Sequence, residues 1–230
     1  QYSKTKRPEG RIAVLYALDS VGALEDADLL KAIGDVHPQV RRHAIRLSES
    51  RLDRSAPLRD GVLALVSDRD PVVQFQLALS LGECHDAAVA KALASIVTQS
   101  TNRDIVDAVL TSVVDRAGAV LTALLADEKW VMNPSSDSVI AAITGQIARQ
   151  RRVDDLAALV ELLEQPNGKH SVGAAALLKA LGHLPADALK GNAPPQLAKL
   201  RDLRQTAAKE IVAEAERVLT DANAKTEDRA

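Results

Sequence analysis

Cysteine, methionine and aromatic residues are almost missing from this sequence of 230 residues. Its one cysteine excludes a disulfide framework and any multi-cysteine metal site within the chain. Its four aromatic residues are too few for a base-stacking platform or an aromatic ligand cage. No uninterrupted apolar run approaches the roughly 20 residues that span a bilayer. The 29 Lys and Arg balance 31 Asp and Glu, which argues against a general nucleic-acid footprint but does not exclude a local basic patch.

The two ends of the sequence indicate a piece of a longer protein. The sequence begins at Gln1 rather than at a methionine, and its one methionine is Met132. The first ten residues are polar and basic and lack the apolar stretch of a signal peptide. We expect residues 1–9 to be disordered or to adjoin a tag, and residues 221–230 to form a frayed tail. The cellular compartment does not follow from these ends.

An internal repeat is the main signal in the chain. Asp35, Pro38 and Val40 recur, all at one constant spacing, as Asp68, Pro71 and Val73. The same step reaches three further valines, which are Val106, Val139 and Val172. Residues four and eight positions after each valine are apolar in nearly every case, and this spacing is typical of one buried stripe on an α-helix.

These stripes predict an all-α fold in which every repeat is a helical hairpin. A second apolar run rich in Ala and Leu follows each first helix, and no alternating pattern typical of strands occurs. A single hairpin cannot bury its apolar faces alone, so neighbours must stack into a superhelix of about six hairpins over residues 10–220. The repeats are expected near residues 10–33, 35–67, 68–100, 101–133, 134–166 and 167–204, with a terminal helix at 205–220.

The residues between the predicted helices support these boundaries. Pro38 and Pro71 suit a first helical turn, and Asp70 is a natural N-cap. Residues 134–137 are a start signal before Val139, and the pair at 167–168 breaks the chain before Val172. Two glycines near the ends of first helices favour left-handed backbone there, and these are Gly82 and Gly182.

The repeat resembles HEAT repeats more than other helical arrays. Ankyrin and tetratricopeptide repeats have a similar length, but their turn and aromatic signatures are missing. Asp35, Val40 and Arg41 match the D-x-x-x-x-V-R pattern of HEAT repeats, and the second copy, which begins at Asp68, matches it more weakly. We expect Arg41 to pair with Asp35 or Asp68 in the ladder that such repeats form.

The first half of the chain also resembles one particular family. The segments RIAVLYALDSVGALEDADLLKAIGDVHPQVRRHAIRLSE, DPVVQFQLALSLGE and DAVLTSV are similar to the HEAT region of planctomycete-type haem-binding, membrane-bound dehydrogenase-like proteins. In that family a β-propeller precedes the HEAT region and a cytochrome c domain follows it. The resemblance implies an extracytoplasmic linker between redox modules, with haem c held elsewhere in the parent protein. No haem or propeller residue can be carried over, because this chain has no CxxCH motif.

The cysteine and histidines do not form a site by their spacing. Cys84 and His85 are adjacent and would point about 100° apart on a helix, so we interpret them as a helix-end thiol beside a surface imidazole. The other histidines lack zinc-ligand spacing and are expected to be solvated or to cap helices. They are His37, His43, His170 and His183.

Two arginine groups and one tryptophan are candidate interaction residues. The first group runs from Arg41 to Arg54 and could bind an anion. We expect instead that its arginines form ion pairs and alternate with Glu49, Asp53 and Asp60 on a solvated face. The second group contains Arg149, Arg151 and Arg152. Trp130 lies in the longest segment between helices, where it either anchors a partner or fills a gap between repeats; we favour packing. Trp130, Arg149 and Arg152 are the candidate interaction surface.

No sequence feature predicts catalysis. Phosphate-binding glycine loops are missing, and no carboxylate pair is placed for acid–base chemistry. We therefore expect a non-enzymatic scaffold without a cofactor or metal of its own, which contacts protein or neighbouring domains of the same chain, binds no nucleic acid and has no membrane span. Two alternatives stay open: a nucleic-acid binder of the HEAT-like DNA glycosylase type, and a HEAT-type lyase acting on a tetrapyrrole.

Overall fold

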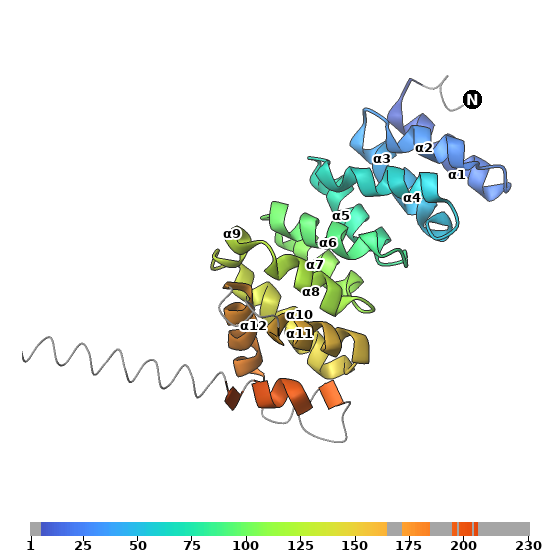
Figure 1. Ribbon diagram of the computed structural model, residues 1–230. Helices are drawn as coiled ribbons and strands as arrows, with labels where there is room; N and C mark the ends of the chain where they lie inside the picture. Colours follow the sequence, from blue (N-terminus) through green and yellow to red (C-terminus); the bar gives the residue numbers. More distant parts are fainter. Residues whose placement is uncertain (1–5, 165–171, 185–194, 197, 204, 207–230) are drawn as a thin grey trace, which may run out of the picture. The chain divides into compact units, whose positions relative to one another are not determined.

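The computed structural model describes residues 6–164, 172–184, 195–196, 198–203 and 205–206 (Figure 1). All regular structure in this part of the chain is helical and none of it is strand, which confirms the predicted all-α class. The chain divides into two compact units, residues 1–124 and 125–230. The predicted break at 167–168, most of the terminal helix at 205–220 and the tail at 221–230 lie outside the described residues.

Four helical hairpins make up the first unit. Its helices are listed in chain order: α1 (Pro8–Ser20), α2 (Asp26–Ile33), α3 (Pro38–Ser48), α4 (Ala56–Leu63), α5 (Pro71–Leu81), α6 (Ala88–Gln99), α7 (Arg103–Ser112) and α8 (Ala117–Leu125). Short 3₁₀ turns extend α3 at Glu49–Arg51 and α4 at Ala64–Ser67. The helix at Pro8 begins inside the segment 1–9 that was expected to be disordered, because proline is favourable in a first turn.

The first helices of the hairpins pack against one another in series. Helix α1 contacts α3, α3 contacts α5, and α5 contacts α7 (Figure 1). On the other side, α2 contacts α4, and the 3₁₀ turn after α4 contacts α6. Pro38 and Pro71 open α3 and α5, and the Asp70 side chain accepts a hydrogen bond from the Val72 amide at 3.0 Å, so both predicted start signals are correct.

The predicted buried stripe fits the second and third hairpins and then moves by one residue. Val40 and Val73, with the residues four and eight positions after each, are buried. On α7, however, Val106 is only half-buried and Val114 is 45% exposed. The buried stripe there is Ile105, Val109 and Val113.

The loops before these helices reveal the origin of this displacement. In the loop before α3, the Asp35 carboxylate accepts the His37 amide, and the His37 ring accepts the Gln39 amide. The same pair of turns recurs one full period later at Asp68 and Asp70, and then again at Ser100 and Asn102. This third copy comes one residue too early for the period. The loops before α5 and α7 have the same length, and the missing residue lies between α5 and α6, because α6 starts 17 residues after α5 whereas α4 starts 18 residues after α3. The repeat that begins with α5 is thus one residue short, and a one-residue slip turns a helix by about 100°.

Gly82 is not left-handed as expected. It has a right-handed φ of −59°, and its role is close approach, since a Cβ there would lie 3.0 Å from the Ser112 side chain on α7. Gly182 lies inside a helix of the second unit. The left-handed glycine among the described residues is Gly22, in the loop between α1 and α2, with a φ of 69°.

The second unit contains the end of α8 and the remaining described helices, α9 (Glu128–Val131), α10 (Ser136–Gln150), α11 (Val153–Glu164) and α12 (Val172–His183). On α10 the expected stripe is buried from Val139 onward. On α12 it moves by one residue, because Val172 is half-buried whereas Gly173 and Leu177 are buried. A Cβ at Gly173 would lie 2.5 Å from the Leu125 carbonyl oxygen, so this glycine allows α12 to lie against the end of α8.

Candidate docking face on helices α3, α5 and α7

The exposed face of α5 carries two large apolar side chains in the first unit. Phe75 is 38% exposed and Leu79 is 36% exposed. They lie four residues apart, so they form one ridge along the helix. The buried stripe of α5 occupies the opposite positions, which leaves this ridge without a partner in the core.

Neighbouring helices present charged or polar residues at the equivalent positions. Counting from the N-cap of each helix, the place of Phe75 is taken by Arg42 on α3 and by Asp107 on α7. The place of Leu79 is taken by Arg46 and Thr111. Across three adjacent helices, the face therefore changes from cationic through apolar to anionic.

A groove of about 760 Å³ lies on the side of this ridge nearer the beginnings of α5 and α7. Its apolar lining is Val72, Phe75, Leu79, Ile105 and Ala108. Arg42 lines it from α3, and Asp104 and Asp107 line it from α7. This is an open surface groove with an apolar lining and charges of opposite sign on its two rims.

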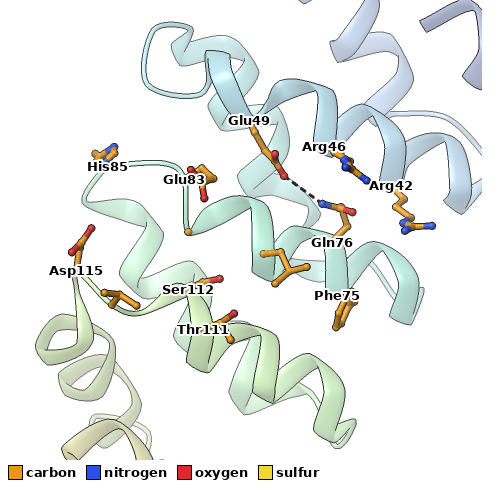
Figure 2. A pocket seen from close by; sticks show the side chains of 13 residues that line it. Arg42, Arg46, Glu49, Phe75, Gln76, Glu83, His85, Thr111, Ser112 and Asp115 are labelled. Atoms are coloured by element: carbon orange, nitrogen blue, oxygen red, sulfur yellow. Dashed lines mark hydrogen bonds between the residues drawn. The ribbon is translucent and has the colours of Figure 1, made fainter. Parts of the chain in front are cut away.

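A second, more polar hollow of about 700 Å³ adjoins the other end of the ridge. Figure 2 shows Arg46 on α3, Glu49 at the start of the 3₁₀ turn after it, Gln76 on α5, and Ser112 on α7 around it. The Ser80 hydroxyl donates to Glu49 Oε1 at 2.6 Å, and the Gln76 amide donates to the Ser80 hydroxyl at 3.1 Å. The Glu49 carboxylate thus accepts hydrogen bonds from α5, which ties α3 to α5.

The two arginines of the face are available for a ligand. Arg42 donates to the Gln39 side chain at 3.4 Å, and Arg46 is exposed. Neither makes an ion pair within the described part of the chain. On the opposite rim, Asp107 lies 3.7 Å from Arg103 in a solvent-exposed pair one helical turn apart, which is a weak interaction.

His43 lies on α3 next to this face and has a structural partner. The Tyr16 hydroxyl of α1 lies 2.9 Å from His43 Nδ1, and the two rings meet edge to face at 5.5 Å. Burial lowers the pKa of His43, and the nearby charges of Arg42 and Arg46 lower it further. This hydrogen bond between Tyr16 and the His43 ring joins α1 to α3.

The arginines of the expected ladder are structural. Arg41 holds both Asp68 oxygens at 2.6 and 3.0 Å and also donates to the Asp35 carbonyl at 2.9 Å, so the predicted pairing is correct. Arg11 holds the Asp35 carboxylate in the same way at 2.7 and 2.8 Å.

Arg51 was expected on the solvated face, but it pairs with Asp26 at 3.0 Å. A hydrogen bond from Ser55 and then one from Arg51 lower the pKa of Asp26. Arg59 similarly pairs with Asp86 at 3.1 Å, so hairpins α1–α2, α3–α4 and α5–α6 are tied by further ion pairs besides the ladder.

Cys84 and His85 occupy different environments, as the sequence indicated. Cys84 is fully buried, and burial raises the pKa of its thiol, which disfavours a reactive thiolate. The His85 ring is exposed and lies 2.8 Å from Asp53, which also accepts the His85 amide at 2.8 Å. These two hydrogen bonds hold the pKa of Asp53 below its ordinary value.

The predicted surface of Trp130, Arg149 and Arg152 lies in the second unit. Trp130 is half-buried on α9, its backbone amide capped by Asp127, while Arg149 is exposed near the end of α10. Arg152 lies 3.5 Å from Asp155 at the start of α11. None of these three residues lines either of the two hollows beside Phe75.

The remaining histidines add little chemistry to this face. His37 caps α3, His183 is exposed at the end of α12, and His170 lies outside the described residues. Within the described ranges, no cluster of three or more His, Cys, Asp or Glu side chains could hold a metal ion. None of the described helices combines the length and apolar character needed to cross a bilayer.

Sequence reasoning missed the ridge of Phe75 and Leu79. The signal was present, because one step of the repeat carries Arg42 to Phe75 and Arg46 to Leu79. A large apolar residue at a repeat position that is charged in the preceding copy indicates an exposed apolar side chain. Comparison with known proteins finds no matching family model, curated protein or solved structure.

Proposed function

We propose that this chain is a non-enzymatic HEAT-like scaffold that holds a protein partner or a neighbouring domain on the face of α3, α5 and α7. The observation that carries the proposal is the exposed ridge of Phe75 and Leu79 between two hollows of the first unit. Exposed large apolar side chains that gather in one hollowed place are typical of protein-binding surfaces.

The local geometry of the first unit supports the HEAT-like part of this proposal. Successive first helices pack in series, and their loops repeat the same pair of capping turns. The Arg–Asp fork also recurs, from Arg11 to Asp35 and from Arg41 to Asp68. Stacked units of this kind build extended binding surfaces rather than enclosed catalytic pockets.

The polar groups around the face support a binding role over catalysis. Glu49 accepts hydrogen bonds from α5, His43 is hydrogen-bonded to the Tyr16 hydroxyl, and His85 is held by Asp53. The hollows are open to solvent, whereas tuned acid–base chemistry needs shielded groups. Asp104 and Asp107 face Arg42 across the groove, which disfavours the nucleic-acid alternative because phosphates would be repelled there.

The wider context follows from the family resemblance and stays a prediction. In that setting the chain is a linker between a propeller and a cytochrome c domain of an extracytoplasmic redox protein, and haem c lies outside these residues. The face of α3, α5 and α7 would then contact one of the neighbouring domains of the same polypeptide. Nothing in the described residues assigns a cofactor site to this chain.

Site-specific photo-crosslinking tests the proposed function in the natural full-length polypeptide. A photoreactive phenylalanine analogue replaces Phe75 in one sample and Val36 in a control, because Val36 is an apolar residue that is 92% exposed away from the face. We expect position 75 to crosslink to one defined segment outside residues 1–230 or to one partner protein, as mass spectrometry identifies it. Crosslinks from position 75 as scattered as those from position 36 would refute the scaffold proposal.

A further inference from the structure

The two rims of the groove beside Phe75 carry charges of opposite sign, which gives the groove a direction. Its apolar floor lies between α5 and α7, Arg42 stands on one rim, and Asp104 and Asp107 stand on the other. Arg46 adds a second positive charge one turn further along α3. A ligand that crossed the three helices would meet positive charge first, then apolar surface, then negative charge.

The spacing of the helices sets the length of such a ligand. Packed helices lie about 8–10 Å apart, so the rims on α3 and α7 are separated by roughly 16–20 Å. An extended peptide advances about 3.3 Å per residue, and five or six residues therefore span the groove. A peptide helix would need roughly twice as many residues for the same span, because it advances about 1.5 Å per residue.

We propose that this groove binds a short extended segment of a partner protein in which a large apolar side chain lies between an acidic residue and a basic residue. The acidic residue meets Arg42 and Arg46, the apolar side chain packs against Phe75 and Leu79, and the basic residue meets Asp104 and Asp107. This inference rests on the proposed scaffold function and specifies the chemistry and orientation of what the scaffold holds.

The two kinds of contact have different roles. A buried apolar side chain supplies most of the affinity, because a few central anchors dominate binding energies. Charges at the rim select the partner and fix its orientation, since charges of the same sign placed opposite each other are strongly unfavourable. Placed the other way round in the groove, the same segment would put its base against Arg42 and its acid against Asp107, so the charges fix one orientation of the bound segment.

Selection from a display library of random decapeptides tests the inference on the whole 230-residue chain. We expect the enriched peptides to share an acid, an apolar residue and a base in this order or its reverse along the chain, with the two charged residues about five or six positions apart. A synthetic enriched peptide should bind the Phe75→Ala variant about tenfold more weakly than the unaltered protein. The Val36→Ala variant is the matched control and should bind equally well.

Exchanging the charges on the two rims tests the peptide-binding inference separately from the scaffold proposal. In the double variant Arg42→Glu with Arg46→Glu, selection should replace the acidic residue with a second basic one. The double variant Asp104→Lys with Asp107→Lys should replace the basic residue with a second acidic one. Circular dichroism and thermal melting first establish that each variant is folded, which is expected because these side chains are exposed or half-buried.

The other outcomes overturn the inference. Enriched peptides without the charge pattern, or a pattern unaffected by charge exchange, would show that the rims do not select the segment. Failure to enrich any peptide over the Phe75→Ala variant would show that the groove does not bind extended segments. In each case the scaffold proposal is judged separately, by the crosslinks from position 75.

Discussion

Two neighbouring helix junctions of the first unit, α3–α5 and α5–α7, are held together by different interactions. Between α3 and α5, Arg41 reaches from one helix to the Asp68 carboxylate at the start of the next. Between α5 and α7, the place of Arg41 is taken by Gln74 and the place of Asp68 by Ser100. Gln74 donates to the carbonyls of Leu65, Val66 and Asp68 in the turn and loop that precede α5, so it does not reach across to α7 and the ladder of ion pairs ends.

The far ends of the same helices differ in a complementary way. At the α3–α5 junction, the exposed carboxylate of Asp53 holds His85. At the α5–α7 junction, the Arg116 guanidinium donates to the carbonyl oxygens of Leu81, Gly82 and Cys84 at the end of α5. The first junction therefore relies on a half-buried ion pair at the helix starts, and the second relies on a cation at a helix C-terminus, where the helix dipole favours positive charge.

The largest loss of stability is expected from Asp68→Ala, which removes the ion pair of the α3–α5 junction. It removes both hydrogen bonds to Arg41 and the acceptor for the Asp70 amide, and it leaves a largely buried guanidinium without its carboxylate. We expect a loss of about 3 kcal/mol in the free energy of unfolding, measured in urea.

Two further variants sharpen this result. Asp68→Asn keeps an acceptor for the Asp70 amide and should cost less. Asp107→Ala removes an exposed pair with Arg103 and should change stability by less than about 1 kcal/mol. Equal losses for Asp68→Ala and Asp107→Ala would show that burial of the ladder does not matter.

The next effect is expected from Arg116→Ala, which breaks the second junction. Three carbonyl oxygens at the end of α5 would lose their donor, and hydrogen bonds to charged groups are worth about 1.5–3 kcal/mol each in favourable cases. We expect a loss of about 2 kcal/mol, with part of it recovered in Arg116→Lys because lysine keeps the charge but not the fork of donors. Urea unfolding measures both, and full recovery by lysine would contradict the role given to the fork.

These junctions also show what a sequence of this kind can and cannot reveal. The helix class and the helix starts at Pro38 and Asp70 follow from local chemistry and were predictable, whereas the pairing of Arg41 was expected from the resemblance to HEAT repeats, with Asp35 and Asp68 as its possible partners. The displaced stripe on α7 was not, because a repeat one residue shorter leaves almost no trace when isoleucine and valine are neighbours at 105 and 106. Periodicity predicts a helix face correctly only where the preceding repeat has the expected length.

The candidate face was less predictable than the fold. Phe75 and Leu79 occur in a helix that is apolar on most sides, so their exposure depends on which face α3 and α7 cover. The sequence pointed instead to Trp130, Arg149 and Arg152 as candidate interaction residues, with a packing role favoured for Trp130. Packing between hairpins decides exposure, and no property of a single helix reports it.

Replacing residues of the α3–α5 junction with their counterparts from the α5–α7 junction tests whether the two sets of contacts are interchangeable. In the double variant Arg41→Gln with Asp68→Ser, glutamine should reach the Asp35 carbonyl that Arg41 now contacts, as Gln74 reaches the Asp68 carbonyl. Serine should accept the Asp70 amide, as Ser100 accepts the Asn102 amide. We expect the double variant to lose about 1 kcal/mol, less than the sum of the single variants.

A double-mutant cycle in urea measures the coupling between the two positions, which should amount to about 1–2 kcal/mol for residues in direct contact. Additive losses from the two single variants would mean that the fork contributes no coupling. In that case the recurrence of Arg and Asp at these positions would have no energetic meaning at this junction.

The smallest effect is expected from Asp53→Asn, and it depends on pH. The hydrogen bonds from His85 lower the pKa of Asp53 in the folded protein, so the ionised carboxylate favours folding. This contribution is fully present above the ordinary aspartate pKa of about 4 and is lost as the pH falls through the lower folded-state pKa. The variant should therefore be less stable than the unaltered protein near pH 6, and the difference should shrink as the pH approaches about 2.5.

Urea unfolding across this pH range measures the difference, with Asp60→Asn as the control because Asp60 is exposed on α4. The control should show no such trend. The effect at Asp53 is small because its side chain is 46% exposed and solvent screens the pair with His85. A difference between Asp53→Asn and the unaltered protein that stays constant with pH would mean that the amide and imidazole of His85 bind asparagine as well as aspartate, and the far end of the α3–α5 junction would then be held by hydrogen bonding rather than by charge.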